Sequence, residues 1–138
     1  MPPGRVDAVT TTSTANPGLL VFFRLASGAS AAVALTLGVL GSFMDAGGVR
    51  GIHATLAMVF LVLSLVVALV SFLYGRRVGR KGIGMHGVGV FVLALVQYGL
   101  GEMYLTIPHI GLGLAIVLGA GALFSLAMRR PAAHAAAS

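Results

Sequence analysis

The sequence predicts an all-α protein, an integral membrane four-helix bundle with up-down-up-down topology. The first observation is hydropathy: 58% of the 138 residues are hydrophobic and the mean hydropathy is +1.02, which lies well above the soluble range. The second is the division of the chain into four apolar runs, each long enough to cross a hydrocarbon core of roughly 30 Å. The third is the shortness of the connections, which favours antiparallel packing of successive helices.

The four runs predict helices over residues 18–43, 52–74, 83–102 and 107–128. They make up one transmembrane domain, residues 18–130. Residues 1–17 are rich in Thr, Pro and Ala and contain no apolar signal-peptide core, so they predict a flexible N-terminal tail. Residues 131–138 predict a short flexible C-terminal tail. The chain has no cysteine, which excludes disulfides, thiolate metal sites and c-type haem attachment.

Basic residues gather on one side of the predicted membrane domain. They are Arg5, Arg24, Arg76, Arg77, Arg80, Lys81, Arg129 and Arg130. By the positive-inside rule these segments face the cytoplasm, so both termini are predicted to be cytoplasmic, in a bacterial cytoplasmic membrane. This distribution accounts for the net charge of +6 with the lipid bilayer as partner and without nucleic acid.

Two histidines occupy matching positions, His53 at the start of the second run and His109 at the start of the fourth. These two helices are expected to run in the same direction on opposite sides of the core, so the imidazoles can face each other near the outer surface. Ionisable side chains at membrane depth are generally functional, and neutral imidazole is an axial ligand of haem iron. The pair predicts a haem b held by His53 and His109. The alternative is two unrelated interfacial histidines, solvated or bonded to loop carbonyls.

Four further residues are candidates for the same site. Ala57 and Gly113 each lie one turn beyond a histidine, where a small side chain leaves room for a porphyrin. Arg50 lies one turn before His53 and is a candidate anchor for the haem propionates, because guanidinium binds carboxylates in a bidentate manner. Gln97 lies in the third run, where an amide predicts an interhelical hydrogen bond or a ligand contact.

The remaining ionisable groups give weaker indications. His86 begins the third run on the inner side without a partner histidine at its level, so a functional role, as a proton or quinone contact, is the less favoured interpretation. No role is expected for His134 in the C-terminal tail. Asp45 and Glu102 lie on the outer side, where they either pair with Arg50 or, for Glu102, accept a proton near a cofactor.

The order of these features resembles one four-helix half of the haem A synthase family, and also small four-helix membrane proteins of actinobacteria. The segments that carry the resemblance are RLASGASAAVALTLGVLGSFMDAGGVRGIHATLA, LALVQYGLG and PHIGLGLAIVL. The resemblance implies that His53 and His109 ligate haem and that Gln97 with Gly99 matches the Gln and Gly of the family's third helix. The family's catalytic half has a glutamate where this chain has Arg50. The resemblance therefore implies a half that holds haem b rather than one that hydroxylates haem.

Three functions remain open from the sequence. The first is a small membrane cytochrome b that transfers electrons to or from a quinone or a redox protein, as a homo-oligomer or within a larger membrane complex. The second is a cofactor-free accessory or assembly subunit whose small-residue faces pack on such a complex. The third is a haem-modifying protein like haem A synthase. Enzymatic activity is left open, and we expect a non-catalytic electron-transfer or accessory subunit.

Overall fold

The described part of the protein, residues 16–129 of a computed structural model, is all-helical. Its helices are α1 (Pro17–Gly41), α2 (Val49–Arg77), α3 (Lys81–Glu102) and α4 (Thr106–Met128). All four are long and apolar enough to span a membrane. The helix ends differ from the predicted ones by three residues at most. Residues 1–15 and 130–138, with the predicted tails and Arg5, Arg130 and His134, lie outside the described residues.

Local chemistry sets where the helices begin. The Asn16 side-chain oxygen accepts a hydrogen bond from the Gly18 N–H at 2.9 Å, and Pro17 occupies the first helical position, where its missing N–H costs no hydrogen bond. Helix α2 begins directly after Gly48, whose φ of +80° is a left-handed conformation that glycine adopts without steric cost. This glycine explains why α2 starts three residues before the apolar run that predicted it.

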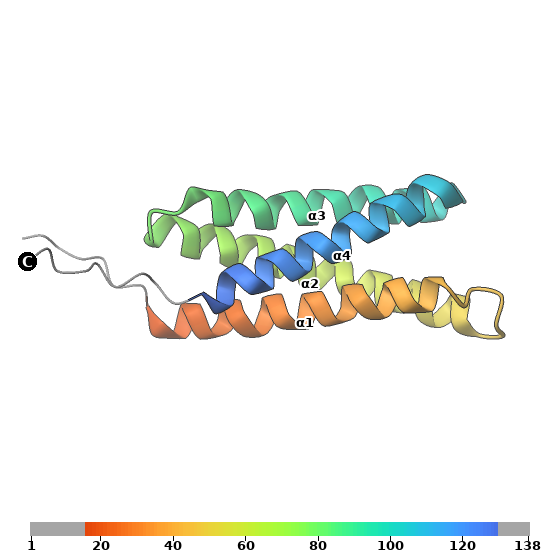
Figure 1. The fold of residues 1–138 in the computed structure, drawn as a ribbon, viewed down its shortest axis with the longest axis horizontal. Helices are drawn as coiled ribbons and strands as arrows, with labels where there is room; N and C mark the ends of the chain where they lie inside the picture. Colours follow the sequence, from red (N-terminus) through yellow and green to blue (C-terminus); the bar gives the residue numbers. More distant parts are fainter. Residues whose placement is uncertain (1–15, 130–138) are drawn as a thin grey trace, which may run out of the picture.

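The chain passes back and forth along the long axis of the molecule (Figure 1). Helices α1 and α3 each pack against both α2 and α4. The start of α1, the α2–α3 turn and the end of α4 lie together at one end, here termed the basic end. It carries Arg24, Arg76, Arg77, Arg80, Lys81 and Arg129. The opposite end, termed the histidine end, holds the α1–α2 and α3–α4 connections and carries His53 and His109.

Helix α4 is inclined across the bundle, from α3 at the histidine end toward α1 at the basic end (Figure 1). Two hydrogen bonds mark the ends of this path. The Gln97 Nε2 of α3 donates to the His109 carbonyl at 2.8 Å near the start of α4. The Arg24 Nε of α1 donates to the Ala127 carbonyl at 3.0 Å near its end. Helix α4 is therefore tied to a different neighbour at each end.

Glycines bring α2 and α3 into close contact near the basic end. A Cβ added at Gly84 would lie 2.9 Å from the Phe72 Cα, and one added at Gly87 would overlap the Ser71 hydroxyl. Small residues let helix backbones approach in this way. Not every glycine in the four helices lies at such a close contact. No atom of a neighbouring helix lies within 4 Å of a Cβ added at Gly89, Gly99, Gly111 or Gly121.

The buried core fills only part of the bundle. The cluster nearest the basic end comprises Phe23, Ala26, Val67, Val70, Tyr74, Ile83, Leu123 and Ala127. The cluster at mid-bundle comprises Ala34, Phe60, Val90, Ala94, Ile116 and Ala120. By contrast, no residue in 35–59 or 95–115 is buried. The core therefore stops before the histidine end.

Candidate functional site

His53 and His109 face each other across the histidine end. Their ring centroids are 6.2 Å apart and their planes are inclined by 53°. Both side chains are half-buried, although their helices, α2 and α4, do not approach each other closely along their backbones. The structure thus brings together the two histidines that the sequence singled out.

The two histidines lie at the same depth relative to the core. Seven residues separate His53 from Phe60, and seven separate His109 from Ile116, which are the first buried side chains of α2 and α4. Seven residues are two helical turns, or about 10 Å. Protein interiors are normally close-packed, yet in this layer no described side chain is fully buried. The protein's own side chains are therefore only partly covered in the layer beside the histidines.

His109 is held by a reciprocal pair of hydrogen bonds with Gln97. The His109 Nδ1 lies 3.1 Å from the main-chain carbonyl oxygen of Gln97, and the side-chain Nε2 of Gln97 donates to the main-chain carbonyl of His109 at 2.8 Å. Because a carbonyl only accepts, Nδ1 is the nitrogen that carries the proton, and Nε2 keeps its lone pair for a ligand. A Cβ at Gly101 would lie 3.2 Å from the His109 Cε1, so this glycine lets the ring lie against α3.

Two of the predicted small residues have different surroundings. A Cβ at Gly113 would lie 2.9 Å from the Gln97 Nε2, so the space at Gly113 accommodates the Gln97 amide, where the sequence analysis had assigned it to a porphyrin. Ala57 is half-buried one turn beyond His53. The Gln97 Oε1 is buried and has no hydrogen-bond partner among the described residues.

His53 has fewer fixed contacts than His109. Its Nδ1 is buried without a hydrogen-bond partner among the described residues. A Cβ at Gly41 would lie 3.8 Å from the His53 Cε1, so the end of α1 lies beside the ring. Buried polar groups in native proteins almost always have a partner. An unpartnered nitrogen on one imidazole that faces another is consistent with a site completed by a group outside the polypeptide.

The charged candidates lie around this pair. Arg50, one turn before His53, is exposed, and so are Asp45 and Glu102. The exposed position of Arg50 suits contact with an acidic group at the rim of the site. Glu102, the acid–base residue that a haem-modifying reaction would need, is the last residue of α3.

Among the described residues, His53 and His109 form a pair and do not belong to a larger cluster of metal-ligating side chains. Within residues 16–129, no three His, Cys, Asp or Glu side chains come together, whereas catalytic zinc takes three protein ligands and structural zinc takes four. Haem iron receives its equatorial nitrogens from the porphyrin and requires only axial ligands from the protein. A first-row metal binds an imidazole nitrogen at about 2 Å, so two imidazoles on opposite sides of one ion have centroids about 6 Å apart. The observed spacing of 6.2 Å is close to this value, and it also lies within the range of about 4.5–7 Å found for ordinary ring pairs.

His86 lies away from the pair. Its Nε2 donates to the Gly119 carbonyl at 2.8 Å and thereby links α3 to α4. This bond does not test a proton or quinone contact of His86. It gives the side chain a structural role.

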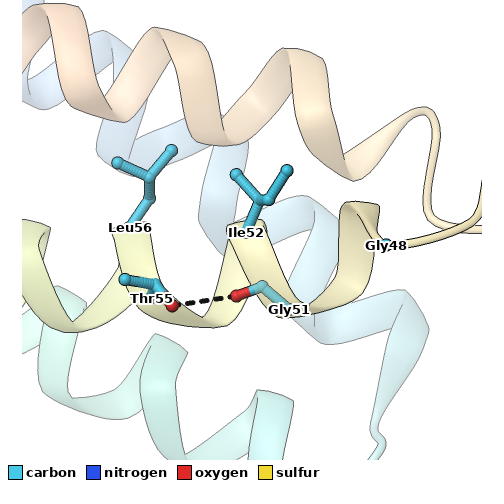
Figure 2. A pocket seen from close by; sticks show the side chains of 5 residues that line it. All are labelled: Gly48, Gly51, Ile52, Thr55 and Leu56. Atoms are coloured by element: carbon cyan, nitrogen blue, oxygen red, sulfur yellow. Dashed lines mark hydrogen bonds between the residues drawn. The ribbon is translucent and has the colours of Figure 1, made fainter.

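A shallow surface hollow lies beside the first turns of α2 (Figure 2). Its lining consists of Gly48, Gly51, Ile52, Thr55 and Leu56. Ile52 and Leu56 project toward α1, and the Thr55 hydroxyl donates to the Gly51 carbonyl of its own helix at 3.0 Å. Neither histidine lines this hollow, so it is separate from the candidate site.

Two residues of the site were missed by the sequence analysis. Gly41 and Gly101 lie near the ends of α1 and α3, where an added Cβ would contact the His53 ring and the His109 ring, respectively. The available signal was a glycine in the last turn of each helix at the level of the histidines. Comparison of the chain with protein-family models, curated proteins and solved structures found no match. The assignment of a function therefore depends on the geometry of the histidine end.

Proposed function

We propose that this protein is a small integral membrane cytochrome b, an up-down-up-down bundle in which His53 and His109 bind haem b and support single-electron transfer. The observation that carries the proposal is the 6.2 Å spacing of the two imidazoles. The lack of buried side chains in 35–59 and 95–115 supports it, because an apolar cofactor would cover side chains that the protein itself leaves partly exposed.

Membrane insertion is supported by what the helices expose. Large apolar side chains point outward on all four helices, among them Leu25, Leu35, Val62, Leu69, Leu95, Leu114 and Leu118. Such extensive apolar faces on a monomer indicate contact with lipid or another protein. The basic end holds six of the described Lys and Arg residues. By the positive-inside rule we place that end in the cytoplasm and the histidine end at the outer surface.

The residues of the site have separate roles in this proposal. When bound, haem supplies a reversible one-electron iron couple. His53 and His109 would hold the haem, and the main-chain carbonyl of Gln97 orients the His109 ring. Arg50 is placed to bind a propionate at the exposed rim. An outer position of the site favours a quinol or an external redox protein as electron partner.

The proposal is tested by absorption spectra of the protein purified in detergent from cells supplied with haem. We expect a sharp α band on reduction, and its loss in His53→Ala and in His109→Ala. His86→Ala is the matched control, because that histidine also lies in a helix but bonds to Gly119 away from the pair. A folded, colourless wild-type protein would overturn the proposal in favour of the cofactor-free accessory subunit. A spectrum unchanged in both pair variants would also overturn it.

A further inference from the structure

The two histidines of the pair are held unequally. His109 shares two hydrogen bonds with Gln97, at 3.1 Å and 2.8 Å, and its ring lies against Gly101. The buried Nδ1 of His53 has no hydrogen-bond partner among the described residues. The geometry therefore distinguishes an anchored imidazole from an unanchored one.

The anchoring of His109 is built into the contact between α3 and α4. The Gln97 amide lies in the space left by Gly113, where a Cβ would approach its Nε2 to 2.9 Å. From there the side-chain amide donates to the backbone carbonyl of His109. The main-chain carbonyl of Gln97 accepts the hydrogen bond from the ring Nδ1. A hydrogen bond of this kind fixes the tautomer and ring orientation and raises the basicity of the ligating nitrogen. His109 is thus prepared to be the stronger ligand.

The His53 ring has fewer hydrogen bonds to break than the His109 ring if it moves away from the site. A buried polar nitrogen without a hydrogen-bond partner is unfavourable, and this cost falls if the ring turns to where water can reach it. His53 itself is only half-buried, and its neighbours Ile52, Ala54 and Thr55 are exposed. Movement of His53 requires no break in the α3–α4 hydrogen bonds.

Resting on the proposed function, we propose that His109 is the fixed ligand and His53 the exchangeable one, so that the protein binds a diatomic gas of the carbon monoxide, nitric oxide or dioxygen class. In this exchange His53 would leave its position open to the gas, and His109 would continue to hold the haem. No electron or proton is transferred. The inference adds a ligand-binding activity to electron transfer.

The test compares His53→Gly with His109→Gly for haem retention through gel filtration and for binding of carbon monoxide by the reduced protein. We expect His53→Gly to keep its haem and to bind carbon monoxide about tenfold faster than wild type, since no protein ligand has to leave. We expect His109→Gly to lose its haem. Gln97→Leu removes the side-chain amide that bonds to the His109 carbonyl, keeps the main-chain acceptor of the His109 Nδ1, and is expected to lower haem affinity about tenfold. Thr55→Val is the matched control, because the Thr55 hydroxyl bonds only to its own helix.

A second measurement requires no haem. Nitrogen NMR spectra of histidine-labelled apoprotein should show His109 with its proton on Nδ1, both in wild type and in Gln97→Leu, because the acceptor of that proton is the main-chain carbonyl of Gln97. Equal haem retention in the two glycine variants, better retention in His109→Gly, or an apoprotein in which His109 carries its proton on Nε2 would overturn the inference. Wild-type protein without haem would overturn the proposed function itself, so the two failures are distinguishable.

Discussion

The imidazoles of His53 and His109 lie 6.2 Å apart between centroids, although α2 and α4 are not packing neighbours. The pair therefore depends on the helices between them. Helix α3 holds His109 through Gln97, and the end of α1 lies beside His53 at Gly41. Substitutions at residues that do not contact the ring nitrogens of either histidine should therefore change the relative position of the two rings.

Gly101→Ala should weaken haem binding by about tenfold, a loss typical of changes beside a metal ligand. The added methyl would lie 3.2 Å from the His109 Cε1 and would push the ring out of line with His53. Haem titration of the apoprotein in detergent measures the change. Gly111→Ala is the control, because a Cβ there meets nothing within 4 Å and lies about 200° around α4 from His109. Equal affinities for the two variants would contradict the described position of the His109 ring.

Gly87→Ala should destabilise the bundle by about 1–3 kcal/mol, the usual cost of overpacking. A Cβ at Gly87 overlaps the Ser71 hydroxyl, so α2 and α3 would have to separate. Gly89→Ala, two residues on, meets nothing within 4 Å and should be neutral or stabilising by up to about 1 kcal/mol. Unfolding of both variants in mixed detergent and denaturing surfactant provides the free energies. A Gly87→Ala protein as stable as Gly89→Ala would show that the two helices are not in close contact.

Arg24→Leu should cost about 2 kcal/mol of stability, because it removes a hydrogen bond from a charged donor to the Ala127 carbonyl. The loss also removes a positive charge from the C-terminal end of the α4 dipole. The haem spectrum should stay unchanged, since Arg24 lies at the basic end. Arg80→Ala, an exposed arginine at the same end, serves as the control. A shifted spectrum in Arg24→Leu would mean that the two ends of the bundle are coupled.

Membrane orientation can be measured directly because the chain contains no cysteine. Ala46→Cys places a thiol in the exposed α1–α2 connection, and Arg80→Cys places one in the α2–α3 turn. In intact spheroplasts a membrane-impermeant maleimide should label only Ala46→Cys, and Arg80→Cys should react after permeabilisation. The opposite pattern would invert the orientation, and labelling of both in intact cells would contradict a transmembrane bundle.

Much of the fold follows from one-dimensional patterns. Apolar runs of membrane-spanning length predicted four helices to within three residues at each end, because helix length and hydropathy are local properties. The histidines were identifiable because ionisable residues in apolar runs are rare. The end of α2 was placed too early, since Gly75 and the basic residues after it read as a break although they continue the helix.

By itself, the sequence determined the helical class, the apolar surfaces, the basic end and the histidine pair as candidate ligands. Only the tertiary structure decided that Gln97 anchors His109 and not His53, that Gly113 makes room for an amide, and that the core stops two turns short of the histidines. These relationships come from the inclination of α4 between α3 and α1 (Figure 1). That inclination is set by side-chain packing among helices distant in sequence, which hydropathy and spacing do not encode.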